Sequence, residues 1–175
     1  PDVLGLKVSP FVLSDLACSA SCARQIFPNP ITCDLFQPGC TSWDADKQEK
    51  RVYPWGNTFI GSLLNFCDKN CSFDRADKSV DDGYAETSPV GHYPDGASFY
   101  GLLDMAGNVW EWVADWYDAY PGNTVSNDSY GTTYRVMRGG SWYYNEYFVR
   151  SAFRGRGGPS NSGDLVGFRC ARSLP

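Results

Sequence analysis

The chain has 175 residues and a formal net charge of −5, and 42% of its residues are apolar and 15% aromatic. This composition excludes a disordered chain and fits one domain with a buried core. No stretch approaches the roughly 18 consecutive apolar residues of a membrane-spanning helix, so we expect no membrane span. The start of the chain has no basic segment and is not typical of an intact signal peptide.

The first part of the chain is rich in residues that form turns. Residues 11–27 fit one short helix, with Ser14 or Asp15 as its N-terminal cap. Prolines and cysteines make residues 28–46 typical of a loop pinned by disulfides. Residues 65–84 are rich in Asp, Asn and Ser, which predicts a polar loop.

Alternating patterns in the last part of the chain predict short strands. Residues 135–142 alternate like a strand interrupted by a glycine pair, and residues 147–154 alternate in part. Residues 155–164 are typical of a loop, and residues 166–172 predict a closing strand. Because there is no internal repeat and no domain boundary, we expect one α+β domain with short strands and much irregular structure.

Seven cysteines are many for a cytosolic protein. They stand at positions 18, 22, 33, 40, 67, 71 and 170. Their spacing does not fit a zinc ribbon, and the chain has a single histidine, so disulfides are favoured over zinc. Disulfides imply an oxidising compartment, and we therefore expect an extracellular or periplasmic protein. Because seven is odd, one cysteine is free or pairs outside the chain.

Charge is unevenly distributed along the chain. Residues 131–175 hold seven arginines against two acidic residues, so residues 1–130 carry the acidic excess. Arginines that pair with acids across the fold would explain this pattern, and an arginine-lined pocket is the alternative. The RGRGG sequence at 154–158 resembles an RNA-binding segment, but one copy in an acidic chain is a weak signal. We expect no nucleic-acid partner.

Two clusters of oxygen-bearing residues could bind calcium, which would stabilise an irregular domain. In the first, the side chains of Asp104, Asn108 and Glu111 could converge with the carbonyl groups of Gly107 and Val109. The alternative for this segment is a helix start in which Asn108 caps and Glu111 completes a capping box.

The second cluster contains Asn65 and Phe66, followed by the adjacent acids Asp81 and Asp82 and then by Tyr84. Adjacent carboxylates repel one another unless a cation lies between them. A second calcium ion is therefore one interpretation, and a solvated acidic loop is the other.

Aromatic residues gather in two places. Those of residues 110–117 are typical of a core, whereas residues 142–148 have a composition found both at recognition surfaces and at strand edges. Sequence motifs of nucleophilic hydrolases, nucleotide-binding loops and metalloproteases are absent. The lone histidine, His92, could act as an acid or base, but a structural role is the ordinary one.

Five distinctive segments occur in a fixed order: YPWGN (53–57), DDGY through SPVG (81–91), YGLLDMAGNVWEW (100–112), RVMRGGSW (135–142) and GFRCAR (167–172). Together they resemble the formylglycine-generating enzyme and sulfatase-modifying factor family. The resemblance implies a single-domain variation on the C-type lectin fold with little regular secondary structure. It makes residues 51–175 the family-like core and residues 1–50 a divergent, cysteine-rich segment of the same domain.

The resemblance also implies two structural calcium ions. One would bind Asn65, Asp82 and the carbonyl groups of Phe66 and Tyr84. The other would bind Asp104, Asn108, Glu111 and the carbonyl groups of Gly107 and Val109. These are the two clusters described above.

Enzymes of the family oxidise a substrate cysteine with O₂ at a copper ion held by two cysteines that follow the GGS motif. Here Tyr144 and Val149 stand at about those positions, and neither supplies the thiolate that Cu(I) needs. Ser141 and Trp110 match positions near the family's active site. Cys170 matches a cysteine that is normally disulfide-bonded. We therefore expect no copper.

The sequence thus predicts a non-catalytic, extracellular, calcium-stabilised binding or structural module. Its partner would be a protein, a peptide, a glycan or a neighbouring subunit of a larger assembly. The predicted recognition surface comprises Trp142, Tyr143, Tyr144, Asn145, Glu146 and Arg156. The alternatives are an enzyme of the same superfamily with altered oxidative chemistry and a purely structural subunit.

Overall fold

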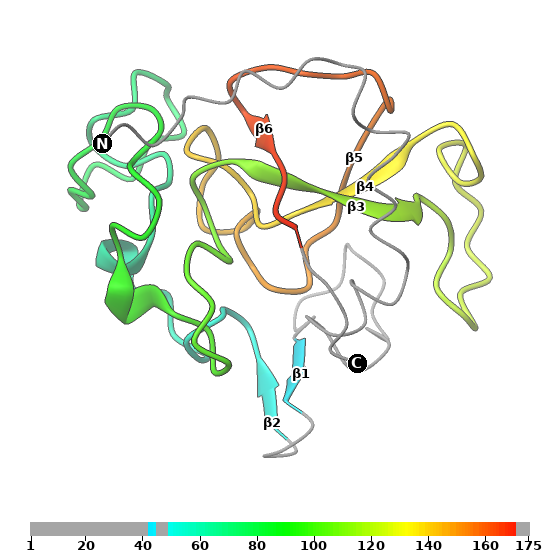
Figure 1. Ribbon diagram of the computed structural model, residues 1–175, viewed down its shortest axis with the longest axis horizontal. Coiled ribbons are helices and arrows are strands. Elements are labelled where there is room, and N and C mark those ends of the chain that lie inside the picture. The colour runs from blue at the N-terminus through cyan, green and yellow to red at the C-terminus, as the bar shows by residue number, and fades with distance from the viewer. Residues whose placement is uncertain (1–41, 45–48, 171–175) are drawn as a thin grey trace.

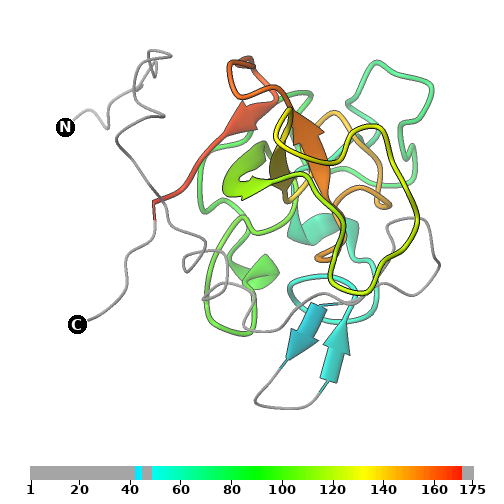
Figure 2. The same ribbon diagram turned by 90° about the vertical axis from the view of Figure 1, so that its right-hand side faces the viewer.

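The computed structural model describes residues 42–44 and 49–170, and its largest element is a four-stranded sheet (Figure 1). The strands of this sheet are β3 (Trp110–Trp116), β4 (Arg135–Arg138), β5 (Gly155–Gly157) and β6 (Val166–Gly167). Two further strands, β1 (Ser42–Asp44) and β2 (Glu49–Arg51), form an antiparallel hairpin that lies apart from the sheet in both views (Figures 1 and 2).

The sheet has the order β5-β4-β3-β6. Strand β4 is antiparallel to both β3 and β5, whereas β6 runs parallel to β3. The pairing of β3 with β4 shifts register between Trp112 and Trp116, as a bulge does. The short strand β5 therefore lies at one edge of the sheet.

The two faces of the sheet carry different residues. A side chain at Gly155 would meet the Trp110 ring at 3.2 Å, and one at Gly157 would meet the Trp112 ring at 2.8 Å. The tryptophans therefore pack directly against the backbone of β5. Because successive residues of a strand point to opposite faces, Arg156 projects from the face away from these rings.

The helical elements are short, and the core lies beside the sheet. Only two 3₁₀ turns, η1 (Gly61–Leu63) and η2 (Pro94–Gly96), occur among the described residues. No helix in this part of the chain is long and apolar enough to cross a membrane. The buried cluster consists of Tyr53, Leu64, Phe66, Ala106 and Val149, with Val52, Trp55, Phe59 and Val80 packed around it.

A left-handed turn at Gly107 and Asn108 ties distant segments together. Both residues have positive φ angles, 78° and 61°, which glycine and asparagine tolerate best. The Gly107 amide donates to the Gly139 carbonyl at 2.8 Å, and the Asn108 amide donates to the Asn65 carbonyl at 2.9 Å. The Asn108 carbonyl accepts from the Trp142 amide at 2.8 Å. The turn thus joins the core segment to the loop after β4.

The structure confirms one domain with little regular secondary structure, and it corrects several predicted elements. The strands predicted at 135–142 and 166–172 are shorter, at Arg135–Arg138 and Val166–Gly167. The helical part of the α+β expectation stays unconfirmed, because residues 11–27 lie outside the described residues. The prediction of strand character at 147–154 is wrong, since this segment consists mainly of turns. The prediction of a loop at 155–164 is wrong at its start, because backbone pairing with β4 makes Gly155–Gly157 a strand despite its glycines.

We expect Gly107→Ala to destabilise the fold by about 3 kcal/mol or more, since a side chain there would collide with the Asn65 carbonyl oxygen in addition to straining the backbone. Gly122→Ala is the matched control. Gly122 has a similar φ of 86° but open space around it, so only the backbone cost of about 1 kcal/mol remains. Urea unfolding of both variants measures the difference, and equal losses would contradict this account of the turn.

Candidate cation and recognition sites

The structure brings Phe66, Asp82 and Tyr84 together around one buried carboxylate. The Asp82 carboxylate accepts from the Phe66 amide at 2.9 Å and from the Tyr84 amide at 2.8 Å. Burial raises the pKa of the Asp82 carboxyl to about 6, because a buried carboxylate without a cation is costly to ionise. The neighbouring carboxylate of Asp68, also buried, accepts from the Asp82 amide at 2.5 Å.

Asn65 directly precedes Phe66 in the sequence and is 1% exposed. Its side-chain amide nitrogen donates to the Glu86 carbonyl at 2.7 Å and to Asn108 Oδ1 at 3.4 Å. Its Oδ1 atom is buried and has no hydrogen-bond partner. A cation with oxygen ligands could satisfy an unpartnered buried oxygen such as Asn65 Oδ1 and a buried carboxylate such as that of Asp82. The Asn65, Phe66, Asp82 and Tyr84 set therefore offers oxygens of the type that calcium binds.

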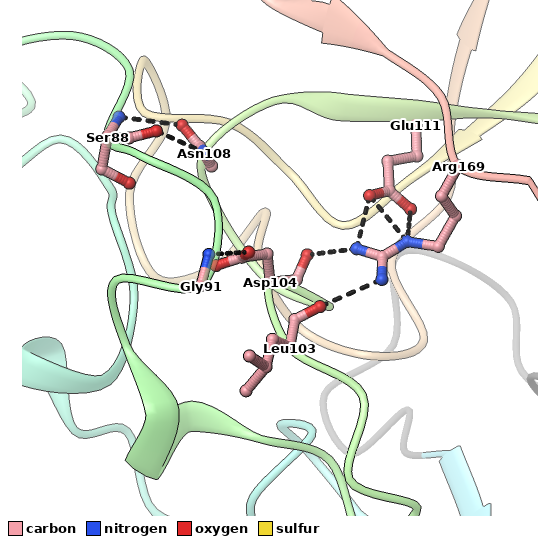
Figure 3. Close-up of polar contacts among 7 residues, drawn as sticks. All are labelled: Ser88, Gly91, Leu103, Asp104, Asn108, Glu111 and Arg169. Atoms are coloured by element: carbon pink, nitrogen blue, oxygen red, sulfur yellow. Dashed lines mark hydrogen bonds and ion pairs between the residues drawn. The ribbon is translucent and has the colours of Figure 1, made fainter. Parts of the chain in front are cut away.

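The second predicted set is divided between two neighbourhoods (Figure 3). Both Glu111 oxygens accept from Arg169, at distances of 2.6 to 2.9 Å, in an ion pair whose side chains are only 21% and 29% exposed. Arg169 also donates to the carbonyl groups of Leu103 and Asp104, at 3.0 and 2.9 Å. This guanidinium therefore joins the start of the turn segment to β3.

The Asn108 side chain lies at the opposite end of this group, against Ser88. Its Oδ1 accepts from the Ser88 amide at 3.1 Å, and its Nδ2 donates to the Ser88 carbonyl at 3.2 Å. The Asp104 carboxylate accepts from the Gly91 amide at 2.7 Å. A helix start, the alternative interpretation, is not what forms, because Trp110–Trp116 is a strand.

The two sets therefore differ in how well they suit an ion. At the Asn65 set an oxygen lacks a partner, whereas at the Glu111 set the carboxylate already has a guanidinium partner. The remaining members of the second set are Gly107, which bonds to Gly139, and Val109, which is half-buried. Among the described residues, no three His, Cys, Asp or Glu side chains converge as metal ligands would. Amide and carbonyl oxygens would supply most of the ligands.

Most of the predicted recognition residues lie along one aromatic segment. The Trp142 ring is buried, and its indole N–H donates to the Asp164 carbonyl at 3.3 Å. The Tyr143 ring contacts Phe73 edge-on at 4.5 Å, and the exposed Arg75 guanidinium lies 3.8 Å from the Tyr143 ring centroid. Arg75 is a residue that the sequence pattern did not single out.

Tyr144 and its successors turn toward the protein. The Tyr144 ring contacts Trp110 at 5.6 Å and Phe148 at 4.7 Å. The Asn145 side chain accepts from the Tyr147 amide at 3.2 Å. Glu146 is exposed and acts on Tyr53, since burial and then the Glu146 charge raise the pKa of the Tyr53 hydroxyl. The surface that remains is Trp142–Glu146 with Phe73 and Arg75.

Arg156 is not brought to this surface. It projects from the other face of β5, where its guanidinium lies 5.4 Å from the Tyr117 ring centroid and 5.8 Å from that of Tyr134. The sequence pattern grouped Arg156 with Tyr143 in one predicted recognition surface. Gly155 and Gly157 of β5 face the tryptophan rings. Because side chains alternate along a strand, Arg156 between them points to the opposite face.

The positions that match the family's copper cysteines are occupied by packed side chains. Val149 is 0% exposed and belongs to the core cluster, and Tyr144 packs on Trp110. Ser141 is likewise fully buried, and its hydroxyl oxygen has no hydrogen-bond partner. The two positions that the resemblance aligns with thiols therefore carry a buried valine and a tyrosine packed on Trp110.

One disulfide lies among the described residues. Cys67 and Cys71 are bonded, with their Cα atoms 5.1 Å apart, as the preference for disulfides over zinc predicted. Cys170 is exposed and is not bonded to another described cysteine. The cysteines at 18, 22, 33 and 40 lie outside the described residues.

His92 lines a shallow, polar pocket of about 270 Å³. The other residues of this pocket are Ser62, Asp81, Asp82, Tyr93, Pro94 and Asp95. The His92 ring packs edge-on between the rings of Tyr84 and Tyr93, at 5.0 and 4.9 Å. These contacts favour the structural role over the catalytic one.

Comparisons with known proteins agree with these observations. The family model described as the sulfatase-modifying factor enzyme 1-like domain matches residues 36–174. The chain is 36% identical over 128 residues to inactive C-alpha-formylglycine-generating enzyme 2 of Mus musculus, which covers 70% of this chain and 37% of that protein. It is 31% identical over 129 residues to formylglycine-generating enzyme of Mus musculus, which covers 70% of this chain and 34% of that protein.

A solved structure is also similar. The structure of PvdO from Pseudomonas aeruginosa shares 30% identity and covers 72% of this chain and 41% of that one, with a TM-score of 0.48. The chain spans a little over a third of the length of the first relatives that it matches.

Arg169→Ala should destabilise the fold by about 2–4 kcal/mol, because it removes one partner of a largely buried ion pair and two hydrogen bonds to carbonyl groups. Lys69→Ala is the control, since the Lys69–Asp81 pair is about half exposed and its loss should change stability little. Thermal and urea unfolding measure both. Equal effects would show that the Glu111–Arg169 pair does not hold the segments together.

Proposed function

We propose, from the premise that this chain belongs to the sulfatase-modifying factor enzyme 1-like domain family, that it is a non-catalytic binding module. The observation that carries the proposal is the identity and packing of Tyr144 and Val149 at the positions of the copper cysteines. A phenol and a buried isopropyl group cannot hold Cu(I), which needs thiolate or thioether ligands. Trp110 and Ser141, which match other positions near the family's active site, are both buried.

The relatives support a family in which both active and inactive members exist. One similar protein is named inactive C-alpha-formylglycine-generating enzyme 2, and another is named formylglycine-generating enzyme. Because this chain spans only part of their length, their names do not decide its chemistry, which depends on its own residues.

The surface Trp142–Glu146, with Phe73 and Arg75, is the proposed recognition site. Its side chains are held by their neighbours: Trp142 by the Asp164 carbonyl and Tyr143 by Phe73 and Arg75. Pre-ordered aromatic side chains and an arginine lose little conformational entropy on binding, which favours recognition of a protein, a peptide or a glycan. A neighbouring subunit of a larger assembly could use the same surface.

Calcium is proposed as the stabilising ion, with the Asn65, Phe66, Asp82 and Tyr84 set as the site that fits it best. At the Asp104–Glu111 set an ion would share Glu111 with Arg169. The ion would have a structural role, offsetting the repulsion of buried carboxylates. The Cys67–Cys71 disulfide supports an oxidising compartment, and we propose an extracellular or periplasmic location.

The test of the non-catalytic role is a direct assay for cysteine oxidation. The purified protein is incubated with Cu(I), O₂ and peptides that contain cysteine, and aldehyde formation is followed by mass spectrometry, with metal content measured in parallel. We expect no stoichiometric copper and no aldehyde. Aldehyde formation would overturn the proposal and favour an enzyme of altered chemistry.

Removing calcium should lower the melting temperature, because an ion bound only to the native state stabilises it by mass action. We expect excess EGTA to lower the melting temperature of the wild type and added calcium to restore it. Asp82→Asn should abolish this response, whereas Asp81→Asn, which changes an exposed neighbour, should retain it. A wild type that melts at the same temperature with EGTA would refute the calcium proposal.

Tyr143→Ala and Arg75→Ala should remove ligand binding while leaving the melting temperature nearly unchanged, because neither residue belongs to the buried core. Binding is measured on peptide and glycan arrays with the wild type and both variants. Phe168→Ala, which changes an exposed aromatic residue elsewhere, should bind like the wild type. Array signals that survive both surface substitutions would exclude this surface, and a lowered melting temperature would favour a purely structural subunit.

A further inference from the structure

The face of the sheet opposite the tryptophans carries a cluster of arginines. Arg156 on β5 pairs in register with Val136 on β4, and Arg138 follows Val136 by two residues, so these side chains share a face. Arg154 precedes β5, and its guanidinium lies over the same Tyr117 ring as that of Arg156, at 4.3 and 5.4 Å from the centroid. Three guanidinium groups therefore gather at this edge of the sheet.

The loop between β3 and β4 supplies the aromatic wall of the cluster (Figure 1, at the right). The Tyr117 amide donates to the Tyr134 carbonyl, and the Gly131 amide donates to the Tyr117 carbonyl. These bonds fold the loop so that Tyr117 packs on Tyr130 at 5.7 Å. The Arg154 guanidinium is held between two rings, 4.3 Å from the centroid of Tyr117 and 4.2 Å from that of Tyr120.

Arg154 has no anionic partner within the described part of the chain. Its side chain is buried, with 6% of the residue exposed, and its Nε atom has no hydrogen-bond partner. A buried guanidinium that makes only ring contacts leaves strong donors unused, which is costly. Tyrosine faces attract the cation but accept no hydrogen bond in place of water.

Arg138, in contrast, is well supplied with acceptors. It donates to the carbonyl groups of Ala152 and Phe153, at 2.9 and 3.0 Å, and to the Tyr120 hydroxyl at 2.8 Å. Burial lowers the pKa of the Arg138 guanidinium, and the charge of Arg154 acts in the same direction, while Tyr120 and Asp115 oppose it. The two guanidinium groups are therefore close enough to repel each other.

We propose that Arg154 and Arg156 form a binding site for an oxyanion, namely the carboxylate, sulfate or phosphate group of a ligand. The free Nε of Arg154 and the terminal nitrogens of a guanidinium match a pair of oxygens in one plane. Arg156 is exposed on the edge strand and supplies the accessible part of the site, whereas Arg154, fixed between two rings, supplies the pre-ordered part. A bound anion also offsets the repulsion between Arg138 and Arg154.

This site is separate from the Trp142–Glu146 surface, because β5 places the two on opposite faces of the sheet. It does not depend on the proposed function. Loss of anion binding and loss of array binding are distinguishable, since each is tested with substitutions that leave the other surface intact.

The experiment uses the full chain and four anions: sulfate, phosphate, acetate and chloride. Binding is measured by isothermal titration calorimetry at constant ionic strength, with chloride as the baseline, so that general salt effects cancel. We expect saturable binding of at least one oxyanion above the chloride baseline. A response to acetate would identify a carboxylate site, and a response to sulfate and phosphate alone would identify a site for tetrahedral groups.

Substitutions locate the site. Arg156→Gln and Arg154→Lys should each weaken the affinity by about tenfold or more, as expected for the loss of a charge-assisted hydrogen bond. Arg150→Gln, which removes another arginine stacked on a tyrosine, should bind like the wild type. Circular dichroism verifies folding. If Arg154→Lys does not fold, Arg156→Gln on the exposed edge decides the question. No saturable oxyanion binding, or wild-type affinity in the Arg156 variant, would overturn the proposal.

Discussion

The left-handed turn at Gly107 and Asn108 is the constraint on which the rest of the structure depends. Its two amides and one carbonyl reach Gly139, Asn65 and Trp142, which belong to segments far apart in the chain. A short sheet and two 3₁₀ turns leave most backbone groups to be satisfied by such irregular contacts. Only a residue without a side chain can stand at position 107, because the Asn65 carbonyl occupies that space. The close approach of these backbones then fixes where the loop after β4 lies.

Buried polar groups that are tied to particular partners add to the stabilisation by the hydrophobic core. The Glu111–Arg169 ion pair joins β3 to the segment that follows β6. The Asn108 side chain binds the backbone of Ser88 and so joins the turn to that loop. The Cys67–Cys71 bond closes a small loop next to buried Asp68. Such an arrangement has little redundancy, since each contact joins a different pair of segments. Asn65 Oδ1 is buried without a hydrogen-bond partner among the described residues, and this is the ground for the proposed calcium site.

The two proposed binding sites lie on opposite faces of the sheet. On the tryptophan face, Trp110 contacts Tyr144 of the proposed recognition surface. On the opposite face, Arg154 and Arg156 lie against tyrosines of the loop between β3 and β4. Sequence patterns predicted the aromatic segment 142–148 and the pairing of arginines with acids, as at Arg169. They missed Arg75, Phe73 and Arg154, because nothing in the local sequence shows which rings a distant arginine will meet.

The sequence by itself determined the family, the single domain, the preference for disulfides and the absence of thiols at Tyr144 and Val149, because these depend on residue types in a fixed order. It also located the oxygen-rich segments around Asn65 and Asp104. The tertiary structure alone decided which of these oxygens meet. It also decided that Glu111 pairs with Arg169 and that Arg156 lies on a different face of the sheet from Tyr143. The physical reason is that two glycines bring β5 against the tryptophan rings. A strand packed on one face must direct its alternate side chains to the other.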